Sequence, residues 1–262
     1  MDLGLKDKVA LVAAASRGLG KAAALELARE GARLAICARS EGIHATARDI
    51  EALTEAEVLA VQADVTVAAE VQRFVASALE RFGRIDILVA NAGGPPPGAF
   101  LSLSEAEWQS AFRLTVMSTV LLCAAVLPSM VERGSGSIVA SQSYLVKQPV
   151  DNLVLSNALR LAVVGLMKSL ANEFGPKGIR VNVINPGWTW TERVQALMED
   201  RAGRSGDTVE AEVSKLTAAI PLKRMGSVEE YGRAVAWLAS SAASYLHGHA
   251  LQYDGGLTQV PL

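Results

Sequence analysis

The stretch Val9-Ala-Leu-Val-Ala-Ala-Ala-Ser-Arg-Gly-Leu-Gly20 decides the fold of this chain. Its apolar run from Val9 to Val12 predicts a parallel strand buried on both faces, and the Ala/Leu-rich residues Lys21 to Glu30 predict a helix. Between them, Gly18 and Gly20 allow a sharp turn and leave no Cβ to block a ligand. A helix that begins at such a turn points its free N–H groups and its positive dipole end outward. The stretch therefore favours binding of a pyrophosphate over a purely structural turn.

Strand and helix patterns alternate along the rest of the chain. The further predicted strands are 33–38, 58–62, 85–90, 137–141, 179–184 and 250–253, and the further predicted helices are 41–53, 68–82, 105–133, 152–174 and 228–240. Asn185-Pro186-Gly187 predicts a break after the sixth strand, and Ser104 with Glu107 predicts a capping box. No repeat or long linker divides the sequence. We predict one α/β domain over residues 1–262, a doubly wound, Rossmann-like parallel sheet of about seven strands with helices on both faces.

The alternation lapses only at residues 188–225, a charged and helical segment that follows a predicted strand. Ligands of such sheets bind beyond the carboxyl ends of the strands, so we predict that this segment covers the substrate. The helix predicted at 152–174 is apolar nearly all round, which indicates burial in the core or at a subunit contact.

Composition excludes several classes of partner. Half of the 262 residues are apolar and the net charge is −2 with no basic stripe, so nucleic acid is not expected to bind. Cys37 and Cys123 lack metal-ligand spacing, and no metal site is predicted. The N-terminus has no hydrophobic export region, and the apolar stretch 116–131 is interrupted by Ser, Thr and Pro, which argues against a membrane span. We expect a cytoplasmic protein that acts on a small molecule.

With these pieces assembled, the chain resembles the short-chain dehydrogenase/reductase family from about residue 5 to residue 258. The matching segments are Ser16-Arg-Gly-Leu-Gly20, Ala63-Asp-Val65, Asn91-Ala-Gly93, Trp108, Ser143, 175–183, Pro186-Gly187 with Thr191, and Asp254-Gly-Gly256. The resemblance implies a nicotinamide dinucleotide cofactor, a carbonyl or alcohol substrate of the 3-oxoacyl reductase type, and a homo-oligomer. The two long apolar helices also favour an oligomer, a tetramer or a dimer.

The same resemblance implies which residues contact the cofactor. Ala14 stands where the family has the first glycine of the turn, which is followed by Ser16, Arg17, Gly18, Leu19 and Gly20. Asp64 and Val65 would flank the adenine, and Asn91, Ala92 and Gly93 the adenosine side. Pro186, Gly187 and Thr191 would hold the nicotinamide end.

Two arginines favour NADP over NAD. The second predicted strand ends at Ala38, where an acidic residue would grip an unmodified ribose, and Arg39 follows. Arg17 lies in the glycine turn itself. Two cations without a carboxylate suit a 2′-phosphate, although a solvated surface role for Arg39 and NAD as cofactor stay open.

The catalytic residues depart from the family pattern of Asn, Ser, Tyr and Lys. The aligned residues are Thr115, Ser143, Ser156 and Arg160, so only the first serine is kept. Ser156 and Arg160 lie one helical turn apart, and Arg160 is expected to bind the ribose. A serine is a far weaker acid than a tyrosine, and losing a general acid lowers a rate by about 10²–10⁴-fold.

Tyr144, with Lys147 three residues on, is the candidate substitute acid, and the alternative is a loop tyrosine packed under the cover. Three functions therefore stay open. The first is an NADP-linked oxidoreductase of altered mechanism, in which Ser143 orients the carbonyl and Ser156, Tyr144 or water supplies the proton. The second is a weak or inactive NADP-binding subunit or sensor. The third is a non-redox enzyme that binds an anionic substrate at Ser143, Ser156 and Arg160.

Overall fold

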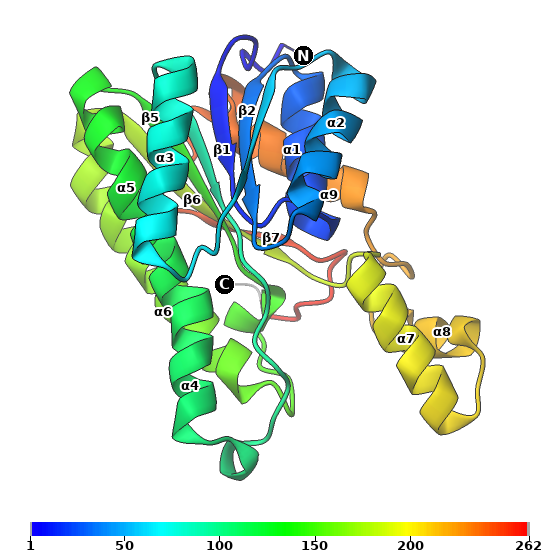
Figure 1. Ribbon diagram of the computed structural model, residues 1–262. Coiled ribbons are helices and arrows are strands. Elements are labelled where there is room, and N and C mark those ends of the chain that lie inside the picture. Colours follow the sequence, from blue (N-terminus) through cyan, green and yellow to red (C-terminus); the bar gives the residue numbers. More distant parts are fainter. Residues whose placement is uncertain (1, 261–262) are drawn as a thin grey trace.

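The computed structural model describes residues 2–260 and contains a parallel sheet in the order β3-β2-β1-β4-β5-β6-β7 (Figure 1). Its seven strands are β1 (Val9–Val12), β2 (Arg33–Ala38), β3 (Val58–Gln62), β4 (Ile87–Ala90), β5 (Gly136–Ser141), β6 (Ile179–Pro186) and β7 (Ala250–Tyr253). The helices are α1 (Gly18–Arg29), α2 (Gly42–Thr54), α3 (Ala68–Phe82), α4 (Glu105–Phe112), α5 (Ser118–Arg133), α6 (Val154–Phe174), α7 (Glu192–Ser205), α8 (Val209–Thr217) and α9 (Val228–Ala239). Short 3₁₀ helices are η1 (Phe100–Ser102), η3 (Tyr144–Val146), η4 (Gly175–Lys177) and η5 (Ser241–Ala243). The strand order reverses beside β1, so the doubly wound prediction is confirmed.

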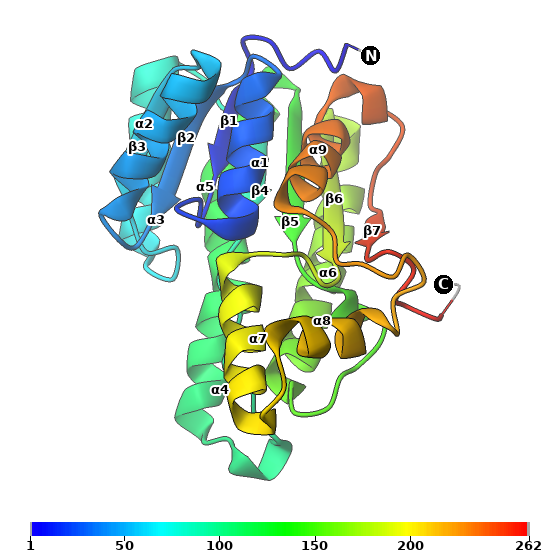
Figure 2. The same cartoon turned by 90° about the vertical axis from the view of Figure 1, so that its right-hand side faces the viewer.

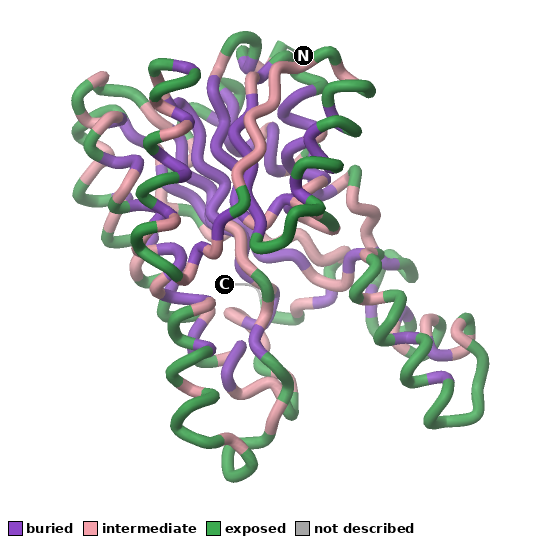
Figure 3. The backbone as a smooth tube through the Cα atoms, in the orientation of Figure 1, coloured by how far each residue is buried: buried purple, intermediate pink, exposed green. Residues whose placement is uncertain are grey.

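The core consists of two layers, one on each face of the sheet (Figures 2 and 3). Side chains of a strand alternate between the faces, so Val9 and Leu11 join the cluster with α3, α5 and α6, whereas Ala10 and Val12 join the cluster with α1, α2 and α9. All four residues of β1 are fully buried. This burial on both faces is what the unbroken apolar run predicted.

The predicted helix 105–133 is helical throughout but not uniform. A five-residue π-helical segment, η2 (Arg113–Met117), separates α4 from α5 and contains Thr115. The predicted capping box is confirmed, because Ser104 Oγ accepts a hydrogen bond from Glu107 N and the Glu107 carboxylate accepts one from Ser104 N. Such π segments occur often at functional sites.

The break predicted after residue 184 needs correction, and of the two settings predicted for the helix 152–174 only complete burial in the core is wrong. The break predicted at Asn185 is wrong, because β6 continues through Pro186, and Asn185 and Pro186 pair with Gln252 and Tyr253 of β7. The helix α6 is buried along one face only, by residues such as Leu159 and Val163. Leu161 on its other face is 53% exposed, so the chain alone does not bury this helix all round.

Two helical runs, Glu105–Arg133 and Val154–Lys177, are long and apolar enough to cross a membrane. The polar residues within 116–131 therefore do not exclude a membrane span by length and composition, contrary to the sequence argument. In this fold both runs pack on the sheet, and the core helix of a globular domain passes the same test of length and composition.

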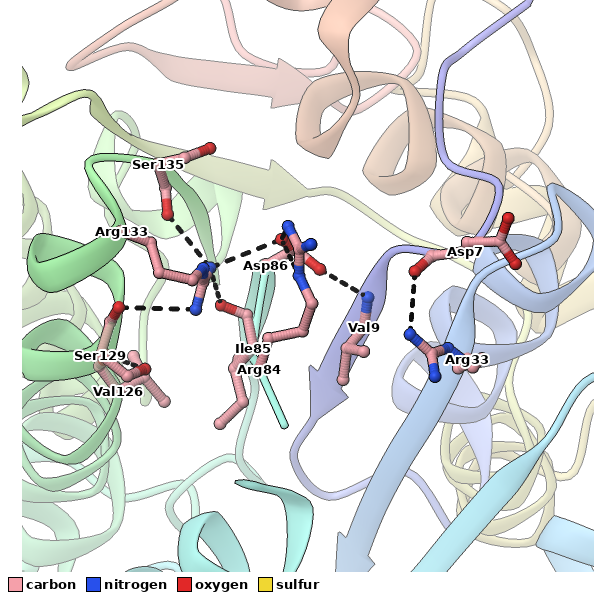
Figure 4. A network of polar contacts seen from close by, with 10 residues as sticks. All are labelled: Asp7, Val9, Arg33, Arg84, Ile85, Asp86, Val126, Ser129, Arg133 and Ser135. Carbon is pink, nitrogen blue, oxygen red and sulfur yellow. Dashed lines mark hydrogen bonds and ion pairs between the residues drawn. The ribbon is translucent and has the colours of Figure 1, made fainter. Parts of the chain in front are cut away.

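At the amino ends of the strands a buried carboxylate ties several segments together (Figure 4). The Asp86 side chain, 6% exposed, accepts hydrogen bonds from Val9 N at 2.9 Å and from Arg84 Nε at 3.0 Å. Arg133 Nη2 lies 3.4 Å from the same carboxylate and donates to Ile85 O at 2.7 Å. The network joins the start of β1 to the end of α5 and closes this edge of the sheet.

The segment after β6 stands clear of the sheet. Figure 1 shows α7 and α8 projecting below the carboxyl ends of the strands, on the opposite side from α4. Its two ends are joined by a bridge, in which Trp190 N donates to Gly226 O at 2.8 Å and Gly226 N donates to Trp188 O at 3.0 Å. The segment is thus an excursion whose two ends are held together by a single β-bridge between Thr189 and Gly226.

Candidate active site

The glycine turn after β1 is built for close approach of another group. A Cβ on Gly20 would lie 2.3 Å from Ala14 O, so only glycine fits there, and Gly18 has a φ of +55°. Helix α1 begins directly at this turn with no side-chain cap and no acidic residue in its first turn. Its first N–H groups are therefore free to bind an anion.

The first position of the turn is occupied by Ala14, which has a φ of +51°. This left-handed conformation is unfavourable for a residue with a Cβ, so Ala14 carries strain that a glycine at this position would not. Asn91, at the end of β4, braces the turn, because its Nδ2 donates to Ala13 O at 3.3 Å and to Ala14 O at 3.4 Å. The next residues, Ala92 and Gly93, are partly exposed and exposed, respectively.

The start of α7 packs over the same turn. Around a Cβ placed on Gly18, Thr191 Cγ2 would lie at 3.6 Å and Glu192 Oε2 at 3.8 Å. Gly187 fits only as glycine, because a Cβ there would lie 2.7 Å from Asp254 Cβ. The end of β6, with Pro186 and Gly187, is thereby joined to the glycine turn through Thr191.

A hollow of about 640 Å³ lies at the ends of β2 and β3, the side on which the adenosine is expected. Arg39, Asp64 and Arg73 contribute to its lining, and Gln62 Nε2 donates to Arg39 O at 2.8 Å. Arg39 and Arg17 are both exposed, whereas Val65 is buried beneath the turn in which Asp64 accepts hydrogen bonds from Thr66. Ser16 and Leu19 are half-buried, and Ser16 O accepts a hydrogen bond from Thr46.

Arg160 of α6 connects to the loop that carries Ser143. Its Nη1 donates to Gln142 O at 2.9 Å, and its Nη2 would lie 3.3 Å from a Cβ on Gly94. Burial, with the neighbouring Arg193 next in importance, lowers the pKa of Arg160 to about 10, so the side chain is still charged at neutral pH. Ser143 Oγ accepts from Leu145 N, which leaves its O–H free to donate to a ligand.

Ser156, one turn before Arg160, is 6% exposed and makes no side-chain hydrogen bond within residues 2–260. Two acceptors on neighbouring segments, Thr115 Oγ1 and Gln142 Oε1, are buried without a partner in this part of the chain. Buried polar atoms normally have partners, so a site that leaves such atoms unsatisfied is suited to a ligand or to ordered water.

Tyr144 lies at the other side of Ser143, in a small apolar cluster. It is 8% exposed and packs with Leu145, Ile220 and Leu257, with Trp188 at the margin. Burial raises the pKa of its hydroxyl, an effect that the Trp188 indole beside it partly offsets. A raised pKa makes the phenol a weaker acid, and the packing matches the alternative of a tyrosine held under the excursion.

A second cavity, of about 520 Å³, lies at the amino edge of the sheet, where Asp86, Arg180 and His247 contribute to its lining. The Arg180 guanidinium already donates to five backbone carbonyls of the α9–β7 connection and to Ser137 Oγ. His247 Nε2 lies 2.8 Å from Ala171 O, within hydrogen-bonding distance. We regard this cavity as structural because its charged groups have partners within the chain.

The residues at the carboxyl edge fit a nicotinamide dinucleotide, because an uncapped helix start, an obligatory glycine and exposed arginines follow one another along it. One residue at this edge was missed from the sequence. Arg193, two residues after Thr191, places its Nη1 3.0 Å from the position of a Cβ on Gly94. Its spacing from Thr191 was the available signal. Cys37 and Cys123 are buried as expected, and no cluster of metal-binding side chains occurs among the described residues.

Comparison with known proteins agrees with this geometry. A family profile described as "Enoyl-(Acyl carrier protein) reductase" matches residues 13–258. The oxidoreductase UcpA of Salmonella typhimurium is 38% identical over 255 residues, which cover 97% of this chain and 95% of UcpA. A 1,6-dihydroxycyclohexa-2,4-diene-1-carboxylate dehydrogenase of Pseudomonas putida is 37% identical, covering 98% and 94% of the two chains.

Among solved structures, the L-sorbose reductase of Gluconobacter frateurii in complex with NADPH and L-sorbose superimposes with a TM-score of 0.96. It is 32% identical and covers 99% of this chain and 100% of its own. The fold and the glycine turn define a dinucleotide-binding α/β protein. The chain belongs to the short-chain dehydrogenase/reductase family.

Proposed function

We propose that this chain is an NADP-linked oxidoreductase that interconverts a carbonyl and an alcohol. The observation that carries the proposal is the uncapped start of α1 at Gly18, where free N–H groups meet an obligatory glycine at position 20. Family membership and the NADPH complex of the sorbose reductase support the same cofactor. The substrate type predicted from the sequence, a 3-oxoacyl group, stays a prediction.

The cofactor, when bound, would supply or accept the hydride. Ser143 would then donate its O–H to the carbonyl oxygen, since Oγ accepts from Leu145 N and donates to no other group in the described chain. Arg160 would hold the ribose hydroxyls through the guanidinium N–H groups that Gln142 O does not use. The proton would reach the oxygen from Ser156 or from water, since the Tyr144 hydroxyl is packed in its apolar cluster.

Cofactor binding is tested by titrating the chain with NADPH and with NADH and following the nicotinamide fluorescence. We expect NADPH to bind more tightly, because Arg17 and Arg39 offer two cations to a 2′-phosphate. Arg17→Gln and Arg39→Gln should each weaken NADPH binding about 10-fold and leave NADH binding unchanged. Arg48→Gln, an exposed arginine of α2, serves as the matched control.

Turnover is tested with a panel of ketones and NADPH oxidation. If Ser156 supplies or relays the proton, Ser156→Ala slows reduction, whereas Tyr144→Phe leaves it unchanged. A loss of rate in Tyr144→Phe alone assigns the proton to the phenol. Undiminished reduction in both variants refutes both assignments.

One observation favours a second candidate, a binding subunit or sensor that turns over slowly or not at all. The sequence resemblance predicts Ser156 at the position of the family tyrosine, and the nearby phenol of Tyr144 is buried with a raised pKa. Tight NADPH binding without oxidation across the panel supports this candidate. Absence of NADPH binding refutes both.

We also propose a homo-oligomer in the cytoplasm. Phe112 of α4 and Leu161 of α6 are 43% and 53% exposed, so apolar surface stays open on the helices that the sequence assigned to a contact. Light scattering tests the assembly, and a monomer contradicts it.

A further inference from the structure

Two guanidinium groups converge on one point beside the catalytic loop. Measured from the position of a Cβ on Gly94, Arg193 Nη1 lies at 3.0 Å, Arg160 Nη2 at 3.3 Å and Arg193 Nη2 at 3.5 Å. The two side chains come from different elements, α7 and α6, and meet at the segment that follows β4. Because both distances are measured from one point, Arg193 Nη1 and Arg160 Nη2 lie within 6.3 Å of each other.

Neither cation has a counter-charge. Within residues 2–260, no carboxylate lies within 4.0 Å of Arg160 or Arg193, although ten other ion pairs are formed. Arg160 donates one N–H, from Nη1, to the backbone oxygen of Gln142. Arg193 is exposed and Arg160 is half-buried, so water solvates the pair in part while the two like charges repel each other. An anion bound between them would relieve this repulsion.

A second observation indicates that a polar group belongs here. Gln142, whose carbonyl binds Arg160, is 6% exposed and its Oε1 has no partner among the described residues. Thr115, 4% exposed in the π-helical segment, has an unpartnered Oγ1 as well. Gln142 Oε1 can only accept, so a donor such as a substrate hydroxyl or ordered water must satisfy it, whereas the donors for an oxyanion come from the two arginines.

We propose that the substrate of this enzyme carries an oxyanion, a carboxylate or a phosphate, that Arg193 binds together with Arg160. The proposal rests on the proposed function, because it names the substrate class of the same site. Farther along α7, the Arg201 guanidinium carbon lies 6.0 Å from the centroid of the Trp188 ring and extends the positive charge along the excursion.

The cofactor's own diphosphate is the competing source of an oxyanion. The glycine turn expected to bind it lies against Thr191 and Glu192, whereas Arg193 reaches away to Gly94 and Arg160. Arg160 holds the position expected for the nicotinamide ribose, and Gly94 directly follows the expected cofactor segment Asn91–Gly93, so the cofactor passes close to the pair. The substrate is favoured because the free N–H groups at the start of α1 already serve the diphosphate, and the NADP⁺ titration below separates the two sources.

The test measures binding by calorimetry, independently of turnover. The full chain saturated with NADP⁺ is titrated with ketoacids of different length, such as pyruvate, levulinate and 4-oxocyclohexanecarboxylate, and with the amide of each. We expect at least one ketoacid to bind more tightly than its amide, and Arg193→Met to weaken that ketoacid by about 10- to 100-fold without affecting the amide. Arg204→Met is the matched control on α7, because Arg204 is exposed and paired with Asp200.

NADP⁺ affinity separates the two sources. Arg193→Met should change it less than about 3-fold, because a substrate site contributes little to the cofactor's binding energy. A 10-fold loss of NADP⁺ affinity with no change for the ketoacids assigns the pair to the diphosphate and overturns the proposal. So does a wild-type chain that prefers no ketoacid to its amide.

Failure of the proposed function gives a different pattern. In that case the chain does not bind NADP⁺ or does not oxidise NADPH, and the ketoacid titration is repeated without cofactor. Binding that persists there and depends on Arg193 preserves the anion site on a non-redox protein.

Discussion

Arginines lie at both ends of the strands, called here the amino edge and the carboxyl edge, but they differ in how many hydrogen-bond partners they have. At the amino edge, Arg133 and Arg180 are half-buried and their guanidinium groups donate to backbone carbonyls, and Arg133 also reaches the carboxylate of Asp86. At the carboxyl edge, Arg160 makes one hydrogen bond and Arg193 has no carboxylate partner within the described chain. The arginines at the amino ends hold elements together, whereas Arg160 and Arg193 keep N–H groups that can bind a ligand.

Buried side-chain polar atoms without a partner follow the same division with one exception. Thr115 Oγ1, Gln142 Oε1 and Asn185 Oδ1 lack partners among residues 2–260 and lie toward the carboxyl ends of the strands. The exception is Arg33 Nε at the start of β2, and this guanidinium lies over the Phe82 ring at 5.5 Å. The polar groups at the amino edge therefore stabilise the fold, whereas those at the carboxyl edge are available to bind ligands.

The largest change in the free energy of unfolding is expected at the amino edge, in the network around Asp86. Asp86→Ala removes the carboxylate that accepts from Val9 N, Arg84 and Arg133, and leaves two arginines without their anion. Breaking a buried pair by removing one partner destabilises a protein by about 3–5 kcal/mol. Urea denaturation should show this loss, while the NADPH affinity of the folded fraction stays unchanged.

Asp86→Asn is the control, because the amide oxygen can still accept from Val9 N but carries no charge. We expect an intermediate stability. If Asp86→Ala unfolds at the wild-type urea midpoint, the Asp86 network does not stabilise the fold, and the contrast between the amino and carboxyl edges is wrong.

The converse is expected of Arg160→Met at the carboxyl edge. It removes an unpaired, desolvated cation, so the free energy of unfolding should change by less than about 1 kcal/mol, while NADPH binding weakens about 10- to 100-fold through lost ribose contacts. Arg180→Met should do the reverse, with a destabilisation of about 3 kcal/mol and normal binding. Equal effects of the two variants on stability would contradict the division.

The sequence predicted the fold well because periodicity and punctuation report burial directly. The strand 33–38 and the helix 68–82 match β2 and α3 residue for residue, since a continuous apolar run suits a strand buried on both faces and helical spacing suits an amphipathic helix. The failures have local causes. Asn185-Pro186 contains turn-forming residues, yet β7 pairs with both, so tertiary pairing overrode local preference.

The site was harder to predict, because spacing along the chain does not say where a side chain points. The glycine turn was found, since a backbone constraint leaves a mark in the sequence. Arg193 was missed because its approach to Gly94 depends on how α7 packs over the turn. The roles of Ser143, Ser156 and Arg160 stay predictions, since their chemistry depends on a substrate that no contact within the chain defines.

A partnered charge at the carboxyl edge sharpens the comparison further. Arg224 and the backbone N–H of Ser227, in that order, lower the pKa of Glu230 to about 2 from an ordinary value of 4.5. A depressed pKa means that the carboxylate stabilises the fold above about pH 5 and loses this contribution as the pH falls toward 2. The advantage of the wild type over Glu230→Gln in urea should therefore be full at neutral pH and shrink below about pH 5.

Asp200→Asn is the comparison for this pair, since Asp200 makes an exposed i,i+4 pair with Arg204 that should matter little at any pH. If the difference in free energy of unfolding between the wild type and Glu230→Gln is the same at pH 7 and pH 4, the charge of Glu230 does not stabilise the fold.

The smallest effect concerns the glycine turn, where the carboxyl edge tolerates strain. Ala14 has a φ of +51° although its side chain disfavours that region by about 1–2 kcal/mol, and glycine in its place gives up part of this gain because it loses more backbone entropy on folding. Ala14→Gly should raise the free energy of unfolding by about 0.5–1 kcal/mol and leave NADPH affinity within about 2-fold, because Gly20 still meets Ala14 O only through backbone atoms. Ala13→Gly, next to it at a buried position without a positive φ, should instead destabilise the chain. If both variants lose stability equally, the left-handed turn is not strained, and the alanine at the family's glycine position is neutral.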